Sequence, residues 1–199
     1  MNGNTQITML TNIPDYYFIS GDEIKTCEEF IIKCNNLFEN KCELIQIRSK
    51  GFSILEYEKI IKGIMEKANS HRVTVMLNSD MVINDNLFGA HGVHLTTKTA
   101  SSYKRGMYGD SIILSMSCHN MAEIKQAEDI GVSFITLSPV CKTKSHPEAE
   151  PIGWERFSNL AKKTNLPVFA LGGLHPKNLD IAKQNNAVGI ASIRGLWGE

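Results

Sequence analysis

The sequence predicts an α/β fold: a small (β/α)8 TIM barrel that forms one domain over residues 1–199. Short apolar runs alternate with stretches of helical periodicity, which predicts parallel strands joined by helical crossovers. Eight apolar runs occur, which is the number of strands that closes such a barrel. The chain lies at the lower limit of about 200 residues for this fold, so several helices are expected to be short.

The predicted strands are the apolar runs, and amphipathic stretches lie between most of them. The runs span residues 16–20, 43–48, 73–77, 92–95, 111–117, 133–138, 167–171 and 187–192. Apolar residues recur at spacings of three and four over 24–38, 53–68 and 121–130, which predicts helices there. The chain is expected to save length after the third strand, over 80–88, and after the eighth, over 193–199.

Composition and charge exclude several classes of protein. Lys plus Arg and Asp plus Glu both number 21, so the net charge is zero, and no nucleic-acid partner is expected. The absence of a polybasic block, of 18 consecutive apolar residues and of a signal peptide argues against a membrane partner and against secretion. Five cysteines without a CxxC pair favour reduced thiols, several of them in the core, in a cytoplasmic protein.

In a barrel of this kind the active site lies at the carboxyl ends of the strands. Gly172 and Gly173 follow the seventh strand directly, and Pro176 then begins a helix. Ser192 ends the eighth strand, Ile193 follows it, and this loop is expected to begin another short helix. Loops 7 and 8 often form a phosphate site in this fold, so we expect one here. The alternative is a tight turn that merely requires glycine.

Two further groups of polar residues follow strands. Gln46, Arg48 and Lys50 alternate along one strand, so their side chains share one side and favour an anionic or heteroaromatic ligand. The alternative is a solvated strand end. His119, after the fifth strand, is a candidate general acid or base, whereas Cys118 beside it is expected to pack in the core.

Histidines raise a second possibility at the same end of the barrel. His94, His119, His146 and His175 each fall at the end of a different strand, as zinc ligands do in some barrel hydrolases. The chain has no HxH motif after the first strand, where Phe18 and Ser20 stand instead. The sequence therefore favours isolated histidines over a metal centre.

Seven segments together resemble one protein family. YYFIS, QIRSK, GVHL, SMSCHN, LSPVCKTKSHP, ALGGLHPKN and GIASIRG follow one another across about residues 15–197. In this order they are similar to the thiamine phosphate synthase / TenI family of small (β/α)8 barrels. For a synthase, the resemblance implies the joining of a pyrimidine diphosphate to a thiazole phosphate with the help of Mg²⁺.

The resemblance implies roles for residues of this sequence. Gln46, Arg48 and Lys50 would hold the pyrimidine and the pyrophosphate. Ser117 matches a serine that binds pyrophosphate, and Thr143 matches a threonine that contacts the thiazole phosphate. The remaining expected substrate-binding residues are Asn78, His94 and Ser145, and the expected phosphate-binding residues are Gly172, Gly173, Ser192 and Ile193.

The sequence departs from the synthase pattern at the metal site. The family's Mg²⁺ ligands are an Asp after the Asn of the third strand and an Asp after the fourth strand. Here the first position is Ser79, and 96–99 contain no carboxylate. Mg²⁺ is usually bound through one or two carboxylates, and Asp80 could replace only one of them. Lys98 would repel the ion.

The resemblance therefore points to a TenI-like member of the family. Such a member is expected to act without a metal as an aromatising tautomerase on a thiazole carboxylate phosphate. His119 is the expected acid or base, and His146 is a second candidate for proton transfer. The alternatives are a genuine Mg²⁺-dependent synthase and an inactive protein that binds or senses a thiamine precursor. The expected partner is this small molecule, and self-association is possible.

Overall fold

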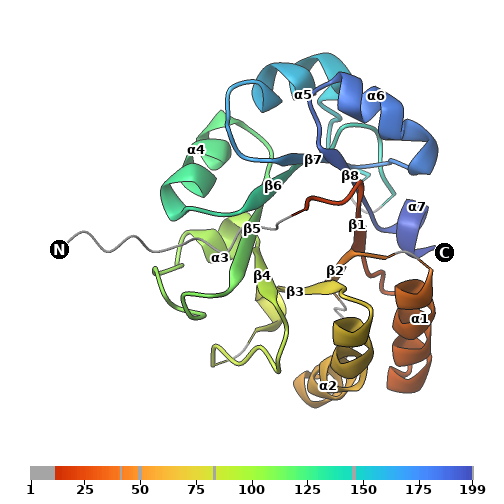
Figure 1. The fold of residues 1–199 in the computed structure, drawn as a ribbon. Coiled ribbons are helices and arrows are strands. Elements are labelled where there is room, and N and C mark those ends of the chain that lie inside the picture. Colours follow the sequence, from red (N-terminus) through yellow and green to blue (C-terminus); the bar gives the residue numbers. More distant parts are fainter. Residues whose placement is uncertain (1–11, 41, 49–50, 83, 145–146, 199) are drawn as a thin grey trace.

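The computed structural model describes residues 12–198, except 41, 49–50, 83 and 145–146. Its strands pair in parallel and in the order of the chain to form a closed barrel, which confirms the predicted fold (Figure 1). The strands are β1 (Tyr16–Ile19), β2 (Leu44–Ile47), β3 (Thr74–Asn78), β4 (Gly92–Leu95), β5 (Ile113–Cys118), β6 (Phe134–Leu137), β7 (Val168–Leu171) and β8 (Gly189–Ser192). The barrel closes where β1 pairs with β8, with Tyr17 opposite Ala191.

Helices surround the barrel on its outside (Figure 1). They are α1 (Cys27–Glu39), α2 (Ile54–Ser70), α3 (Thr97–Ala100), α4 (Met121–Ile130), α5 (Gly153–Ala161), α6 (Leu179–Gln184) and α7 (Arg194–Trp197). Two 3-10 turns, η1 (Ser79–Met81) and η2 (Pro176–Asn178), add to these. The expected saving in length is confirmed, because η1 is the only helical turn among the described residues between β3 and β4, and α7 is a single turn.

Side-chain caps decide where the long helices begin. The Thr26 hydroxyl accepts a hydrogen bond from the backbone N–H of Glu29, so α1 begins at Cys27, three residues later than its periodicity predicts. Ser53 and Glu56 form a capping box at the start of α2. Helix α4 spans 121–130 as predicted, and it ends at Gly131, whose φ of +81° is left-handed.

The interior of the barrel is apolar at one end and polar at the other. At the amino ends of the strands, Phe134 and Phe169 pack on Tyr17, with ring centroids 5.4 and 5.6 Å from the Tyr17 ring. Toward the carboxyl ends, polar side chains are also buried, among them those of Gln46 and His94. Buried polar groups need hydrogen-bond partners, so this end of the barrel is where a built polar site is expected.

Helix α7 ties the end of the chain to α1. Trp197 is buried, and its ring lies 5.0 Å from that of Phe30 in α1. Its indole N–H donates to a carboxylate oxygen of Glu23, which also pairs with Lys33 at 3.3 Å. This anchoring places the loop after β8 over the carboxyl ends of the strands.

Candidate functional site

A cavity of about 670 Å³ opens at the carboxyl ends of the strands. Every predicted site residue that the structure describes lines it. These residues are Gln46, Arg48, Asn78, His94, Ser117, His119, Thr143, Gly172, Gly173, Ser192 and Ile193. The predicted residues Lys50, Ser145 and His146 lie outside the described residues, so their roles stay predictions.

The charges around the cavity favour an anionic ligand. Four of its lining side chains are cationic, Arg48, Lys142, Lys144 and Arg194, whereas Asp80 and Glu148 are its acidic ones among the described residues. The Arg48 guanidinium lies 3.3 Å from Asp22, and its backbone N–H donates to Ser20 at 2.7 Å. An excess of positive charge in a cleft attracts and holds negatively charged small molecules.

On the β2–β3 side of the cavity, amide side chains bond to each other. The Asn78 amide donates to the Gln46 carbonyl oxygen at 2.9 Å, and the Gln46 amide donates to the Tyr17 hydroxyl at 3.0 Å. Gln46 is therefore in the cavity as predicted, but half of its hydrogen-bonding capacity is already used inside the barrel. Burial raises the pKa of the Tyr17 hydroxyl far above its ordinary value, so this group stays protonated.

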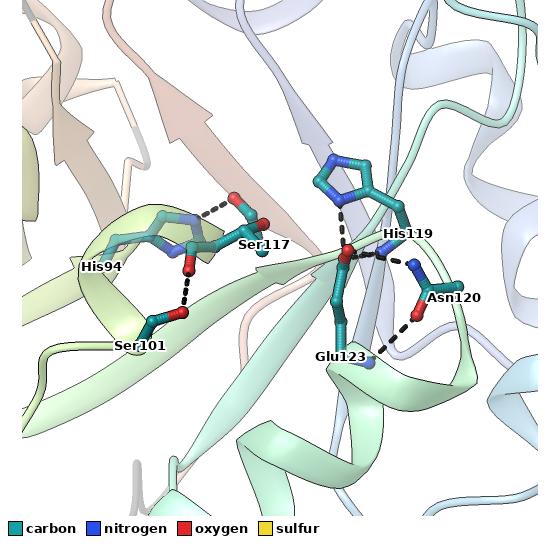
Figure 2. Close-up of polar contacts among 7 residues, drawn as sticks. His94, Ser101, Ser117, His119, Asn120 and Glu123 are labelled. Atoms are coloured by element: carbon teal, nitrogen blue, oxygen red, sulfur yellow. Dashed lines mark hydrogen bonds and ion pairs between the residues drawn. The ribbon is translucent and has the colours of Figure 1, made fainter.

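His94 is the buried histidine of the site. Its Nδ1 lies 2.8 Å from the Ser115 hydroxyl. Its Nε2 lies 2.8 Å from the Ser117 hydroxyl, and Figure 2 shows this second contact. Burial lowers the pKa of the imidazole to about 3, so His94 is neutral at physiological pH. Ser117 lies within β5, and its hydroxyl faces both His94 and the cavity.

His119 stands at the start of α4, where Glu123 holds it (Figure 2). Oε2 of Glu123 lies 2.8 Å from the imidazole Nδ1 and accepts the His119 backbone N–H at 2.7 Å. Asn120 caps α4 by accepting the Glu123 N–H, and its amide donates to the Glu123 carboxylate at 3.0 Å. A carboxylate on Nδ1 orients the ring and leaves Nε2 for a ligand, which is the arrangement of a general base.

Loops 6 and 7 approach each other so closely that the glycine pair has a structural function. Gly172 and Gly173 have φ values of +108° and +67°. A Cβ on Gly172 would lie 2.7 Å from Cα of Pro139, and one on Gly173 would lie 2.3 Å from the Lys142 carbonyl oxygen. The two glycines are therefore needed for the tight turn, as one interpretation of the sequence holds. They also line the cavity, as the interpretation of a phosphate site requires.

Ser192 joins the loops after β7 and β8. Its hydroxyl donates to the Leu174 carbonyl oxygen at 2.7 Å and accepts the Gly195 N–H at 3.0 Å. This leaves the backbone around Ser192 and Ile193, more than the Ser192 hydroxyl itself, to face a ligand. The predicted phosphate site at loops 7 and 8 stays a prediction, since what the structure provides is the shape of the loops.

The residues present do not fit the Mg²⁺ site of a synthase. The Ser79 hydroxyl lies 2.6 Å from that of Thr99 and accepts the Thr96 N–H at 3.1 Å, so it locks η1 against α3. The Asp80 carboxylate accepts the Thr96 hydroxyl at 3.2 Å and is the one acidic group of this segment that lines the cavity. A hydroxyl that is already used and a single carboxylate make a poor donor set for Mg²⁺.

Other expectations concern cysteine, metal and membrane. Four of the five cysteines are buried and unpaired, and burial raises the pKa of the Cys118 thiol to about 12, so its packing role is confirmed. Within the described residues, no group of three or more His, Cys, Asp or Glu side chains could hold a metal ion. No helix in that part of the chain is long and apolar enough to cross a membrane.

Sequence reasoning missed three residues that shape the site, Tyr17, Ser115 and Glu123. Tyr17 and Ser115 look like ordinary strand residues, and only the closure of the barrel brings them beside Gln46 and His94. Glu123 carried a readable signal, since it follows His119 by four residues at a helix start and is therefore within reach of it.

Known proteins are similar to this chain over most of its length. The family described as "Thiamine monophosphate synthase" matches residues 16–196. An Aquifex aeolicus protein named "Putative thiamine-phosphate synthase 2" is 32% identical over 183 residues, which cover 91% of this chain and 96% of that protein. A "Thiamine-phosphate synthase" of Prochlorococcus marinus is 35% identical over 190 residues, 89% of this chain but 54% of that protein.

A solved structure supports the fold. The "Thiamine phosphate pyrophosphorylase from Pyrococcus furiosus" superposes with a TM-score of 0.74 at 21% identity, and the match covers 93% of this chain and 88% of that one.

Proposed function

The chain belongs to the thiamine monophosphate synthase family, and from this premise we propose that it is a TenI-like tautomerase that works without a metal. Its substrate would be a thiazole carboxylate phosphate. The observation that carries the proposal is a cationic cavity that contains an oriented histidine, His119, beside a buried Ser79 whose hydroxyl already bonds to Thr99 and Thr96. Ser79 stands where the family resemblance places a carboxylate ligand of Mg²⁺.

Binding would rely on the two sides of the cavity. The phosphate would lie at the loops after β7 and β8, where Gly172 and Gly173 let the backbone come close, and Arg194 adds positive charge. The substrate carboxylate and ring would then face Arg48 and Ser117. Positive charge on both sides suits a ligand with two anionic groups.

The chemistry needs only a proton transfer within the substrate. One proton leaves one carbon of the heterocycle, another is delivered to a second carbon, and the ring becomes aromatic with no change in composition. His119 would take the first proton on Nε2 while Glu123 stabilises the imidazolium through Nδ1. The His119 imidazolium would then donate a proton to the second carbon of the substrate, so the step requires no metal and no redox partner.

The direct test is to follow tautomerisation of the thiazole carboxylate phosphate by NMR in buffer with EDTA. We expect the wild type to convert it and His119→Ala to lose on the order of a hundredfold or more in rate. His71→Ala is the matched control, since His71 is exposed at the end of α2. Equal rates for wild type and His119→Ala would remove His119 from the mechanism.

A Mg²⁺-dependent synthase is the second candidate. The names of the relatives favour it, and Asp80 at the cavity supplies one carboxylate. Purified protein that condenses the pyrimidine diphosphate with the thiazole phosphate in the presence of Mg²⁺ would establish this activity. A third outcome, binding of the thiazole phosphate without turnover in either assay, would indicate a sensor or an inactive partner subunit.

A further inference from the structure

Inside the barrel, a continuous row of hydrogen bonds leads to the cavity. It begins at the backbone N–H of Asp80, which donates to the Asn78 side-chain oxygen at 3.1 Å. It then passes through the Gln46 amide to the Tyr17 hydroxyl. All three side chains are almost fully buried, so water does not compete for these bonds.

The first link gives the row one direction. A backbone N–H can only donate, so the oxygen of the Asn78 amide must face it and the nitrogen must face Gln46. The Gln46 oxygen then faces Asn78, and the Gln46 nitrogen faces Tyr17. The orientations of both amides, which side-chain shape alone does not settle, follow from this one fixed donor.

A second set of hydrogen bonds lies beside Tyr17 and contains His94, whose ring is 5.9 Å from that of Tyr17. Ser115 is fully buried, and the hydrogen-bond partner that the structure gives its hydroxyl among the described residues is Nδ1 of His94. If Nδ1 carried the proton, Ser115 would accept this bond and its own buried proton would have no acceptor. An unsatisfied buried donor is strongly unfavourable, so Ser115 donates to Nδ1.

Nδ1 of His94 therefore accepts the Ser115 proton at 2.8 Å. A neutral imidazole has one protonated nitrogen, so acceptance at Nδ1 requires the proton to be on Nε2. Nε2 therefore donates to the Ser117 oxygen at 2.8 Å. Thr136, opposite Ser117 in the barrel register, makes no hydrogen bond within the described part of the chain, so it does not take the Ser117 proton.

We propose that His94 is a positioning residue, held as the Nε2–H tautomer, which leaves the Ser117 hydroxyl proton for donation to the ligand in the cavity. The ligand atom that receives this proton is an acceptor, such as a carboxylate or phosphate oxygen. The place of the ligand rests on the proposed function, whereas the tautomer of His94 does not.

Nitrogen-15 NMR of histidine-labelled, ligand-free protein tests the tautomer directly. We expect His94 to show a protonated Nε2 and an unprotonated Nδ1. His91 is the internal reference, because the Val75 backbone N–H donates to its Nδ1 at 3.0 Å and so fixes the same tautomer. A His94 spectrum with the proton on Nδ1, or a doubly protonated ring at neutral pH, would overturn the proposal.

Two matched variants separate direction from simple packing. Ser115→Ala removes the donor to Nδ1, so we expect the Nδ1 resonance to move toward that of an unbonded ring nitrogen while Nε2 stays protonated. Ser117→Ala removes the acceptor on the other side of the ring, and there the Nδ1 resonance should stay near its wild-type position. Equal shifts of the Nδ1 resonance in the two variants, or a proton on Nδ1 in either, would contradict donation from Ser115 to His94.

The donor role has its own measurement, titration with thiazole-2-carboxylate, an oxyanion probe that carries a carboxylate and no phosphate. We expect Ser117→Ala to bind it about ten- to a hundredfold more weakly than the wild type, the loss of one bond to a charged group. Unchanged affinity in Ser117→Ala, or no binding by the wild type, would refute the donor role of Ser117 toward oxyanions. Absence of binding together with the Nε2–H tautomer would leave the positioning by His94 standing while the ligand class fails.

Discussion

His119 and Glu123 show how one side chain can prepare another for chemistry. The carboxylate accepts both the backbone N–H and the imidazole of His119, while Asn120 bonds it from a third side. Glu123 lies in the first turn of α4, so its carboxylate fixes the position of the His119 imidazole relative to the helix. This arrangement makes Glu123 a positioning residue for the proposed proton transfer.

Glu123→Gln keeps the shape of this contact and removes its charge. We expect the tautomerisation kcat to fall by roughly tenfold with a smaller change in KM, because the imidazolium is no longer stabilised. The NMR assay on purified variants measures it. Glu128→Gln, a substitution on the same helix away from the cavity, should behave as the wild type. Unchanged kcat in Glu123→Gln would show that the carboxylate serves only the helix cap.

His94 predicts a specific pH dependence of stability. Its pKa is about 3 in the folded protein and about 6.5 in the unfolded chain, so the unfolded state binds the proton first as the pH falls. The free energy of unfolding should therefore decrease below about pH 6.5, by up to about 1.4 kcal/mol per pH unit.

Urea unfolding between pH 7 and 5 measures this effect, with His94→Gln as the comparison. The variant lacks the titrating ring, so its stability should depend less on pH over the same range. If wild type and His94→Gln lose stability in parallel, His94 is not the group responsible.

The close approach of loops 6 and 7 requires a residue without a side chain at Gly173. A comparison with Gly153 separates the cost of the steric clash from the cost of a left-handed φ. Gly173→Ala combines a left-handed φ with a Cβ 2.3 Å from the Lys142 carbonyl oxygen, whereas Gly153→Ala has a similar φ of +70° and no atom within 4 Å. We expect Gly173→Ala to lower the free energy of unfolding by more than Gly153→Ala, which should cost about 1 kcal/mol or slightly more. Equal losses in urea unfolding would mean that the approach of the loops adds nothing.

The strands and the helices α1, α2 and α4 were predictable because each of them has a local signal, whereas no range was predicted for the shorter helices. The strand runs and the periodicity of 121–130 lie close to the observed β1–β8 and α4. The start of α1 was misplaced by three residues because an apolar residue, Ile24, precedes the Thr26 cap. Periodicity reports which side is buried, whereas the end of a helix depends on individual hydrogen bonds.

At the level of the whole barrel, the sequence predicts the cavity but not the hydrogen bonds between the side chains inside it. The described residues that it selected converge because parallel strands bring their carboxyl ends together. The hydrogen bonds from Asp80 to Tyr17, and those of His94 with Ser115 and Ser117, were not predictable, since they join different strands through contacts that exist only when the barrel closes. Asn78 and Asp80 are close in sequence, but their contact does not indicate that Asn78 also bonds to Gln46 on a neighbouring strand.

We expect the cavity to bind a phosphorylated heterocycle without a divalent cation. The attraction comes from the positive charges of Arg48, Lys142, Lys144 and Arg194. Asp80 is the one carboxylate that the segment after β3 presents to the cavity, and the hydroxyl of its neighbour Ser79 already bonds to Thr99. Binding should therefore weaken with increasing salt and should not depend on Mg²⁺.

Calorimetric titration of the full chain with thiazole phosphate, once in EDTA and once in excess Mg²⁺, tests this claim most directly. We expect saturable binding with the same Kd in both buffers. Binding that appears only when Mg²⁺ is added, or no binding in either buffer, would contradict the account.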